Sequence, residues 1–258
     1  MEGPPRVLRE AAAQFGVRLD DLLPLGGRSN QVFATERHVL RVTDVAVAQR
    51  ETAASAAAAA VVPVPRVLDR LDFGPESVAL LERMPGEPAW IPARLHPDRA
   101  WRRGAACARV HAVLTKILAP PEVPVVAVEG LEREDVTLLH LDLHPLNILL
   151  GDDDEVSAVL DWANAASGPS SLDRARTATI LYLDPSVQAM KGDPSWNAFV
   201  AGWTQAAQLD RVPSPALAWA AGFMQRDLAC RATVSTLEKL RRLRLRAEDV
   251  PYVDVASL

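Results

Sequence analysis

The chain has 258 residues, of which 49% are hydrophobic and 24% are charged, and its formal net charge is −5. This length allows one large domain or two small lobes, and the composition is ordinary for a soluble globular protein. The acidic balance argues against general binding to nucleic acids. No apolar run approaches the ~20 residues of a membrane span, and the N-terminus lacks the pattern of a secretory signal. A cytoplasmic protein without a membrane partner is therefore expected.

Helical and extended segments alternate in the first third of the sequence. A helix is predicted over residues 5–15, because prolines suit its start and Gly16 suits its end. A second helix, capped by Thr43 or Asp44, is expected to run to about Ala60. The segments expected to be strands are 22–25, 31–34, 38–42, 67–73 and 78–84.

The chain breaks at Pro85-Gly86, and the sequence beyond this break is mainly helical. Residues 1–84 are therefore predicted to form an N-terminal lobe and residues 85–258 a C-terminal lobe. Helices are expected at 98–118, 172–183, 196–208 and 215–246. The predicted fold class is α+β, with a small antiparallel sheet in the first lobe and a mainly helical second lobe.

The most specific motif runs from His140 to Asn147 and reads H-x-D-x-x-x-x-N, the spacing of a phosphoryl-transfer catalytic loop. Two apolar runs separated by a turn follow, and the second run ends at Asp161. In this order, Asp142 can orient an attacking hydroxyl and accept its proton. The amide oxygen of Asn147 and the carboxylate of Asp161 can hold Mg²⁺. For Asp142 and Asn147, the alternative interpretation is an ordinary surface turn.

The order of these pieces resembles the aminoglycoside phosphotransferase and choline kinase family, whose members share a bilobal, protein-kinase-like fold. The similarity extends from about Leu25 to Arg176, and the catalytic-loop motif is its most specific part. Trp162 stands where protein kinases have the phenylalanine of D-F-G, which favours the small-molecule branch. The resemblance implies ATP, with GTP also possible, and Mg²⁺ as cofactors, and a small-molecule hydroxyl as acceptor.

The resemblance also assigns nucleotide-binding roles. A glycine turn at 26–32 would cover the phosphates, and a hinge at 82–84 would read the adenine edge. The residues expected to contact the nucleotide are Gly26, Gly27, Ser29, Asn30, Val32, Arg41, Glu51, Glu82, Met84 and Ile148. A plain β-turn is the alternative for the glycine turn, and sheet core is the alternative for Val32, Leu81 and Ile148.

Arg41 is the main departure from the family pattern, which usually places lysine on this strand. The first lobe contains no lysine that can substitute for it. Arginine keeps the charge and forks well onto phosphate, and Glu51 would orient it. The alternative is weakened nucleotide binding, as in a pseudokinase, but the presence of Asp142, Asn147 and Asp161 favours an active enzyme.

Other polar residues near the motif are expected to act structurally. His140 is expected to bond backbone near Asp161, and His144 to fix the geometry of the loop. Asp173 would brace the loop or cap its own helix. His111 is interpreted as a satisfied core histidine.

The acceptor site is expected to be built by the C-terminal helices, because the short stretch between Pro85 and His140 holds only one long predicted helix. The candidate contacts are Asp184, Asp193, Trp196, Trp203, Asp227 and Arg231, although tryptophans at helical spacing are more often core. Acidic side chains suit a cationic acceptor. The predicted activity is ATP-dependent phosphorylation of an antibiotic hydroxyl, on an aminoglycoside or another cationic antibiotic, for resistance or self-protection.

Two alternatives to this activity remain open. One is a metabolic kinase for an amino alcohol, a sugar or a homoserine-like compound. The other is a nucleotide-binding regulator without catalysis. The protein is expected to be a monomer or a homodimer.

Overall fold

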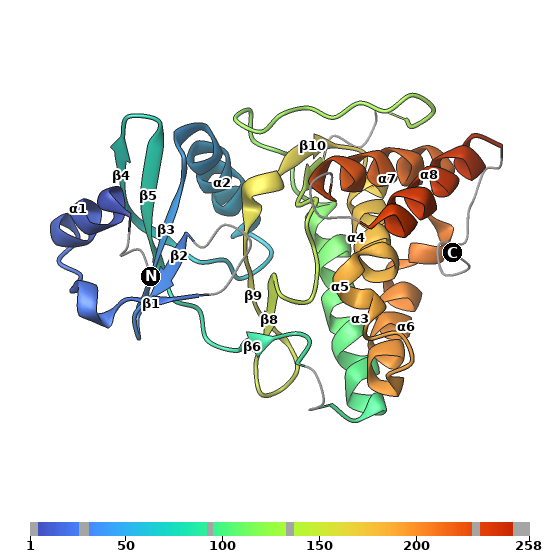
Figure 1. The fold of residues 1–258 in the computed structure, drawn as a ribbon, viewed down its shortest axis with the longest axis horizontal. Coiled ribbons are helices and arrows are strands. Elements are labelled where there is room, and N and C mark those ends of the chain that lie inside the picture. The colour runs from blue at the N-terminus through green and yellow to red at the C-terminus, as the bar shows by residue number, and fades with distance from the viewer. Residues whose placement is uncertain (1–4, 26–30, 92–94, 133–136, 229–232, 250–258) are drawn as a thin grey trace.

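The computed structural model describes residues 5–25, 31–91, 95–132, 137–228 and 233–249. One end of the molecule in Figure 1 contains a small sheet and two helices, and the other end contains a larger group of helices. Short strands lie between these two parts. This is the predicted α+β architecture with a protein-kinase-like arrangement.

The small sheet has five antiparallel strands in the order β1-β2-β3-β5-β4. Its strands are β1 (Leu23–Pro24), β2 (Val32–Ala34), β3 (His38–Asp44), β4 (Val67–Phe73) and β5 (Glu76–Glu82). The prediction for β4 is confirmed, whereas β5 begins and ends two residues before the predicted strand. Val32 lies opposite Arg41 in the register of β2 and β3.

Two helices accompany this sheet, α1 (Arg6–Gln14) and α2 (Val45–Ala58). Apolar residues of α1, such as Leu8, are fully buried against sheet residues that include Leu40 and Val78. Asp44 precedes α2 as expected, but its side chain makes no capping hydrogen bond. Burial of the α1 face against the sheet forms a core separate from that of the helices, whereas Ala54 and Ala58 of α2 belong to the helical core.

Short strands connect the two parts of the molecule. They are β6 (Glu87–Pro88), β8 (Ile148–Leu150) and β9 (Val156–Val159) in one sheet, and β7 (Thr137–Leu139) and β10 (Ala166–Gly168) in another. The short strands β6, β7 and β10 were not predicted. The division into lobes at residues 84 and 85 stays a prediction; the five-stranded sheet ends at Glu82.

The second part contains α3 (Pro97–Leu114), α4 (Ser171–Leu183), α5 (Pro185–Gln188), α6 (Pro194–Ala207), α7 (Ser214–Leu228) and α8 (Val234–Asp249). Short 3-10 helices lie at Leu19–Asp21, Trp162–Asn164 and Leu209–Arg211. Proline at the first position and a side-chain cap start both α3 and α6. None of the described helices combines the length and apolar character that a bilayer crossing requires.

Two predicted helices have different bounds. The helix predicted to reach residue 118 ends at Leu114, because Ile117 and Leu118 instead make sheet-like contacts with β7. The single helix predicted over 215–246 is two helices. The side chain of Thr233 accepts a hydrogen bond from the Thr236 N–H (3.2 Å), which starts a new helix at this point.

Helices α3 and α6 lie unusually close together because each contributes a glycine to the contact. A Cβ added at Gly104 would clash with the carbonyl oxygen of Phe199, and one added at Gly202 would clash with that of Trp101. This packing forms the centre of the helical core, in which Trp196, Phe199 and Trp203 are buried.

Candidate functional site

The H-x-D-x-x-x-x-N segment forms the loop between β7 and β8. His140 Nε2 lies 2.8 Å from the carbonyl oxygen of Leu160, and its Nδ1 accepts the Asp142 N–H at 3.2 Å. The imidazole also packs against Trp162, with ring centroids 4.6 Å apart. The predicted contact of His140 with the backbone near Asp161 is therefore confirmed.

Helix α4 holds the opposite side of this loop. The Leu141 N–H donates to Asp173 Oδ1 at 2.7 Å, and Thr177 Oγ1 donates to the Leu143 carbonyl at 2.9 Å. Arg176 Nε donates to the Leu141 carbonyl at 3.1 Å. The predicted brace by Asp173 is confirmed. Residues 176 and 177 were not predicted, although their spacing of three and four from Asp173 places all three on one helix face.

Leu141 itself has φ = 61°, a left-handed conformation that is uncommon for a residue other than glycine. Its side chain is buried in the helical core, so it does not narrow the space near Asp142. The three hydrogen bonds from α4 and the burial of this side chain hold the strained backbone in place. The loop that carries Asp142 is consequently fixed in place by α4.

Asp142 and Asn147 are in direct contact across the loop. The side-chain Nδ2 of Asn147 donates to the Asp142 backbone carbonyl at 3.0 Å and lies 3.5 Å from Asp142 Oδ2. His144 Nε2 is 3.8 Å from the same carboxylate oxygen, and its Nδ1 accepts the Leu146 N–H at 3.2 Å. This second contact agrees with the expectation that His144 fixes the loop.

Asp161 is brought to this loop by the strand that precedes it. The Leu160 N–H donates to the Asn147 carbonyl at 2.8 Å, so Asp161 follows directly after a residue tied to the loop. Asp161 has left-handed backbone angles, and its carboxylate accepts the Ala163 N–H at 3.4 Å. The two predicted metal ligands, Asn147 and Asp161, therefore lie on neighbouring segments of the folded chain.

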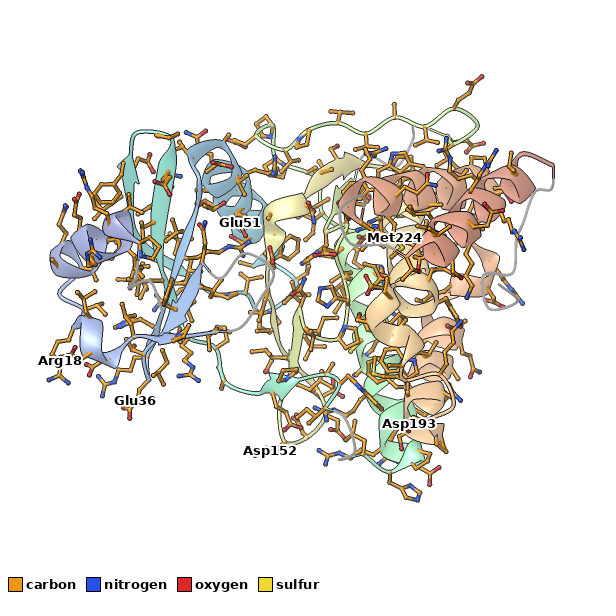
Figure 2. All side chains as sticks on the ribbon, in the orientation of Figure 1. Arg18, Glu36, Glu51, Asp152, Asp193 and Met224 are labelled. Carbon is orange, nitrogen blue, oxygen red and sulfur yellow. The ribbon has the colours of Figure 1, made fainter. Side chains whose placement is uncertain are left out.

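Arg41 joins the sheet lobe to this site. Its guanidinium lies 2.9 Å from Glu51 Oε1 and 2.7 Å from Asp161 Oδ1. The predicted pairing of Arg41 with Glu51 is present, and Glu51 lies between α2 and β9 in Figure 2. A second link comes from Arg50, whose Nε donates to the Ala163 carbonyl at 2.7 Å.

These charges shift one another's proton affinity. Burial raises the pKa of Glu51 to about 7, against the opposing effect of the Arg41 charge. Burial also acts to raise the pKa of Asp161, but the charge and hydrogen bond of Arg41 outweigh it and hold that pKa below its usual range. Burial acts to lower the pKa of Arg41, and its two carboxylate partners more than offset this.

The predicted nucleotide contacts of the glycine turn and of the apolar lid and floor differ in where the structure places them. Gly26, Gly27, Ser29 and Asn30 lie outside the described residues. Val32 and Leu81 are half-buried, as lid residues can be, whereas Ile148 is fully buried in the helical core, which fits the core alternative.

At the predicted hinge, the backbone N–H groups differ in whether they donate a hydrogen bond to another backbone group. The N–H groups of Glu82 and Arg83 donate to the carbonyls of Arg66 and Arg37. Within the described part of the chain, the Met84 N–H has no such partner. The Glu82 side chain pairs with Arg66 at 2.9 Å.

The donor set fits a magnesium ion that arrives with a nucleotide. Mg²⁺ in such sites takes one or two carboxylates, waters and phosphate oxygens rather than a full protein cage. Asp161 supplies a carboxylate and Asn147 an amide oxygen, and the described residues contain no group of three or more His, Cys, Asp or Glu side chains suited to a metal.

A small cavity of about 20 Å³ lies beside Asp142, between the loop, α4 and α7. Its polar lining consists of Asp142, His144, Arg176, Asp184 and Asp227. Arg176 Nη2 is 2.9 Å from Asp227 Oδ2 and 3.8 Å from Asp142 Oδ1, and its guanidinium lies 4.2 Å from the centre of the Phe223 ring. Two predicted acceptor contacts, Asp184 and Asp227, are therefore near Asp142.

The other predicted acceptor contacts are elsewhere. Asp193 caps α6, and Figure 2 shows it far from Met224, which lines the cavity. Trp196 and Trp203 are buried in the helical core, as tryptophans at helical spacing usually are. Arg231 lies outside the described residues.

Comparisons with known proteins agree with this geometry. Residues 127–223 match the model of the phosphotransferase enzyme family, APH. No curated protein matches the chain significantly.

Solved structures match over nearly the whole chain. A GDP complex of an aminoglycoside 2'-phosphotransferase IIIa mutant has a TM-score of 0.60 at 13% identity, covering 95% of this chain and 98% of that one. A microcompartment-associated aminopropanol kinase gives 0.58 at 15% identity, covering 94% and 95%. A thermostable variant of APH(4)-Ia in complex with AMP-PNP and hygromycin B gives 0.56 at 16% identity, covering 95% and 99%.

Residues 127–223 therefore resemble a phosphotransferase family, and the solved structures show that the chain has a protein-kinase-like fold. The resemblance to the aminoglycoside phosphotransferase and choline kinase family is confirmed over the matched segment, which includes the catalytic loop, Asp161 and Asp173.

Proposed function

We propose that the protein transfers the γ-phosphoryl group of ATP directly to a hydroxyl of a small cationic molecule. The observation that carries this proposal is the pair of ion pairs made by Arg41, with Glu51 and with Asp161. They bring a phosphate-binding cation from the sheet lobe to the carboxylate beside the catalytic loop. Solved structures of the same fold that contain AMP-PNP or GDP support a nucleotide in this position.

Each residue has a defined task in the proposed reaction. Asp142 accepts a hydrogen bond from the acceptor hydroxyl and takes its proton as the oxygen–phosphorus bond forms and the bond to the nucleotide β-phosphate oxygen breaks. Arg41 exchanges Asp161 for nucleotide phosphate oxygens, while Glu51 keeps its guanidinium in place. Asn147 and Asp161 would hold Mg²⁺, which would neutralise phosphate charge. The Met84 N–H, which has no backbone acceptor among the described residues, is the donor proposed to read the adenine edge.

The acidic wall near Asp142 supports a cationic acceptor. Asp184 and Asp227 line the same cavity as Asp142, and carboxylates at this position would attract an amine. We propose an antibiotic with amino groups as the first candidate. The narrow cavity, about 20 Å³, favours a second candidate, a small amino alcohol whose hydroxyl arm alone enters it.

ATP consumption by the full chain with Mg²⁺ tests the proposal and separates these candidates. The acceptors to screen are aminoglycosides, cationic peptide antibiotics, macrolides and amino alcohols. We expect turnover on at least one class. Binding of ATP without consumption on any of them would contradict an enzymatic role.

The matched variants for this assay are Asp142→Asn and Asp152→Asn. Asp152 is exposed in the turn between β8 and β9, and Figure 2 shows it at the edge of the molecule. Loss of the base should lower kcat by roughly 10²- to 10⁴-fold with little change in nucleotide affinity. The control should keep full turnover. Equal activity in both variants would remove Asp142 from its proposed role.

A further inference from the structure

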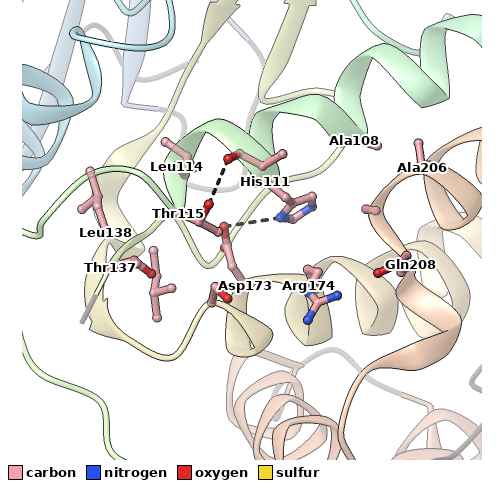
Figure 3. Close-up of a pocket in the computed structure, with 14 residues that line it drawn as sticks. Ala108, His111, Leu114, Thr115, Thr137, Leu138, Asp173, Arg174, Ala206 and Gln208 are labelled. Atoms are coloured by element: carbon pink, nitrogen blue, oxygen red, sulfur yellow. Dashed lines mark hydrogen bonds and ion pairs between the residues drawn. The ribbon is translucent and has the colours of Figure 1, made fainter. Parts of the chain in front are cut away.

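A second pocket lies behind the catalytic loop, between α3, α4, β7 and the end of α6 (Figure 3). Its volume is about 210 Å³, far more than the roughly 10–15 Å³ that one water occupies. It shares no lining residue with the cavity beside Asp142. Its polar lining includes His111, Ser170, Asp173, Arg174 and Gln208.

Arg174 is a cation without a counter-ion in this pocket. It is half-buried, and it forms no ion pair with any residue in the described part of the chain. Burial alone lowers the pKa of its guanidinium. By contrast, Arg176, two residues further along α4, pairs with Asp227 at 2.9 Å.

His111 is a second polar group without a satisfying partner. Its side chain is only 5% exposed, and neither ring nitrogen makes a hydrogen bond with the described residues. Its nearest polar contact, marked in Figure 3, joins Nδ1 to Asp173 Oδ2 at 3.6 Å, which is long for a hydrogen bond. The expectation that His111 is a satisfied core histidine is therefore wrong. Buried polar groups are normally hydrogen-bonded, so this ring is expected to face a ligand or ordered water.

We propose that this pocket binds a small molecule through an oxyanion, a carboxylate or a phosphate group, with Arg174 and His111 as its donors. A forked guanidinium next to a ring N–H is a good donor set for such a group. Asp173 also lines the pocket, but its Oδ1 accepts the Leu141 N–H and its Oδ2 faces His111. The anion consequently binds on the Arg174 side.

Occupation of this pocket would act on the catalytic loop through Asp173. A ligand that orders His111 and the start of α4 favours the conformation in which Asp173 holds the Leu141 N–H. The site is thus a position from which a metabolite can tighten the loop that carries Asp142 without touching the nucleotide or the acceptor.

Nitrogen-15 NMR of the full chain tests this proposal without measuring activity. The Arg174 Nε–H signal, assigned by its loss in Arg174→Gln, is followed during separate titrations with phosphate and with malonate at constant ionic strength. The Arg41 signal is followed in the same spectra, because phosphate is also expected at the nucleotide site. We expect a saturable shift of Arg174 with at least one anion, and slower exchange of the Leu141 amide by threefold or more.

Arg102→Gln is the matched control, because Arg102 is an exposed arginine of α3 that does not line the pocket. The slowing of Leu141 exchange should persist in this control and vanish in Arg174→Gln. Saturation by phosphate alone identifies a phosphorylated ligand, and saturation by malonate alone identifies a carboxylate. A linear, unsaturated response of Arg174 to both anions, equal to that of Arg102, would overturn the proposal.

Acidic residues of the chain itself are the rival occupants. Glu134 and Asp135 precede Thr137, which lines the pocket, and lie outside the described residues. The double variant Glu134→Gln, Asp135→Asn should bind the anions with unchanged affinity. At least tenfold tighter binding in this variant would show that the chain fills the pocket itself, and would also overturn the proposal.

Discussion

The two sides of the catalytic loop are held by different kinds of interaction. Towards the helices, buried hydrogen bonds from Asp173, Arg176 and Thr177 fix the loop backbone. Towards the sheet, the neighbouring Asp161 forms an ion pair with Arg41. The side chain of Asp161 is 38% exposed and that of Arg41 is 20% exposed. The helical side is a fixed support, whereas the sheet side can exchange partners when a nucleotide binds.

This difference predicts which changes damage structure and which damage nucleotide binding. A buried hydrogen-bond donor or acceptor that loses its partner costs the full desolvation of that group. The Arg41–Asp161 ion pair is partly exposed, so its net contribution to stability is smaller than that of the buried hydrogen bonds. Variants on the helical side should therefore lower stability and kcat together, and variants on the sheet side should mainly lower affinity for ATP.

The largest effect is expected from Arg176→Met. This change leaves the Leu141 carbonyl and Asp227 without their arginine partner. Because the Arg176 guanidinium is fully buried and its loss leaves the buried Leu141 carbonyl unsatisfied, the free energy of unfolding should fall by about 2 kcal/mol. Displacement of Asp142 should lower kcat by roughly 10²-fold, with unchanged ATP affinity. Chemical denaturation and steady-state kinetics measure these quantities.

Arg174→Met is the matched control on the same helix. Because Arg174 has no ion-pair partner among the described residues, its loss should leave the free energy of unfolding equal or higher. If both variants lost the same stability, the helical brace would not depend on the contacts of Arg176.

A smaller effect on affinity is expected from Arg41→Gln. Loss of charged hydrogen bonds to the phosphates should weaken ATP binding by roughly 10- to 100-fold. Arg41→Lys, which restores the residue usual in the family, should recover most of this loss. Calorimetric titration with ATP and Mg²⁺ measures the change.

Arg70→Gln provides the control for Arg41→Gln. Arg70 lies on β4 of the same sheet and pairs only with Asp72 among the described residues. It should bind ATP normally. An unchanged ATP affinity in Arg41→Gln would show that nucleotide phosphates are held by another group.

The smallest effect concerns the pH dependence of stability. With its pKa raised to about 7 in the folded protein, Glu51 binds a proton more readily than in the unfolded chain, where its ordinary value is 4.5. Its contribution to stability is therefore fully present below about pH 4.5 and declines as pH rises towards 7. The slope is at most about 1.4 kcal/mol per pH unit.

Comparison of the wild type with Glu51→Gln isolates this contribution. The difference in unfolding free energy should decrease between pH 5 and pH 7, and carbon-13 NMR should place the carboxyl midpoint near the raised pKa of about 7. A midpoint close to 4.5 would mean that the Arg41 charge outweighs burial at this position.

The sequence predicted the parts of the site whose chemistry depends on close spacing. His140, Asp142 and Asn147 lie within eight residues. Asp161 follows β9, which pairs with β8 directly after the loop, so their meeting requires only a short sheet. The pairing of Arg41 with Glu51 was predicted from the family pattern and is present in the structure.

Contacts that depend on tertiary packing could not be read in the same way. The approach of Arg176 to the loop arises because α4 is buried against several elements, which removes the polar face by which helices are normally oriented from sequence. The burial of Ile148 and the unsatisfied ring of His111 likewise depend on how distant segments pack. The break between α7 and α8 escaped prediction because no proline or glycine marks it.

Asn147 and Asp161 are proposed to hold the divalent cation that accompanies the nucleotide, opposite Asp142. Replacing Mg²⁺ with paramagnetic Mn²⁺ tests this most directly by NMR. With AMP-PNP present, the Asn147 side-chain amide and the Ala163 N–H, which donates to Asp161, should broaden beyond detection, while the Gly222 amide on α7 stays sharp. Broadening centred instead on the exposed acidic turn at Asp152, with sharp Asn147 and Ala163 signals, would contradict the account.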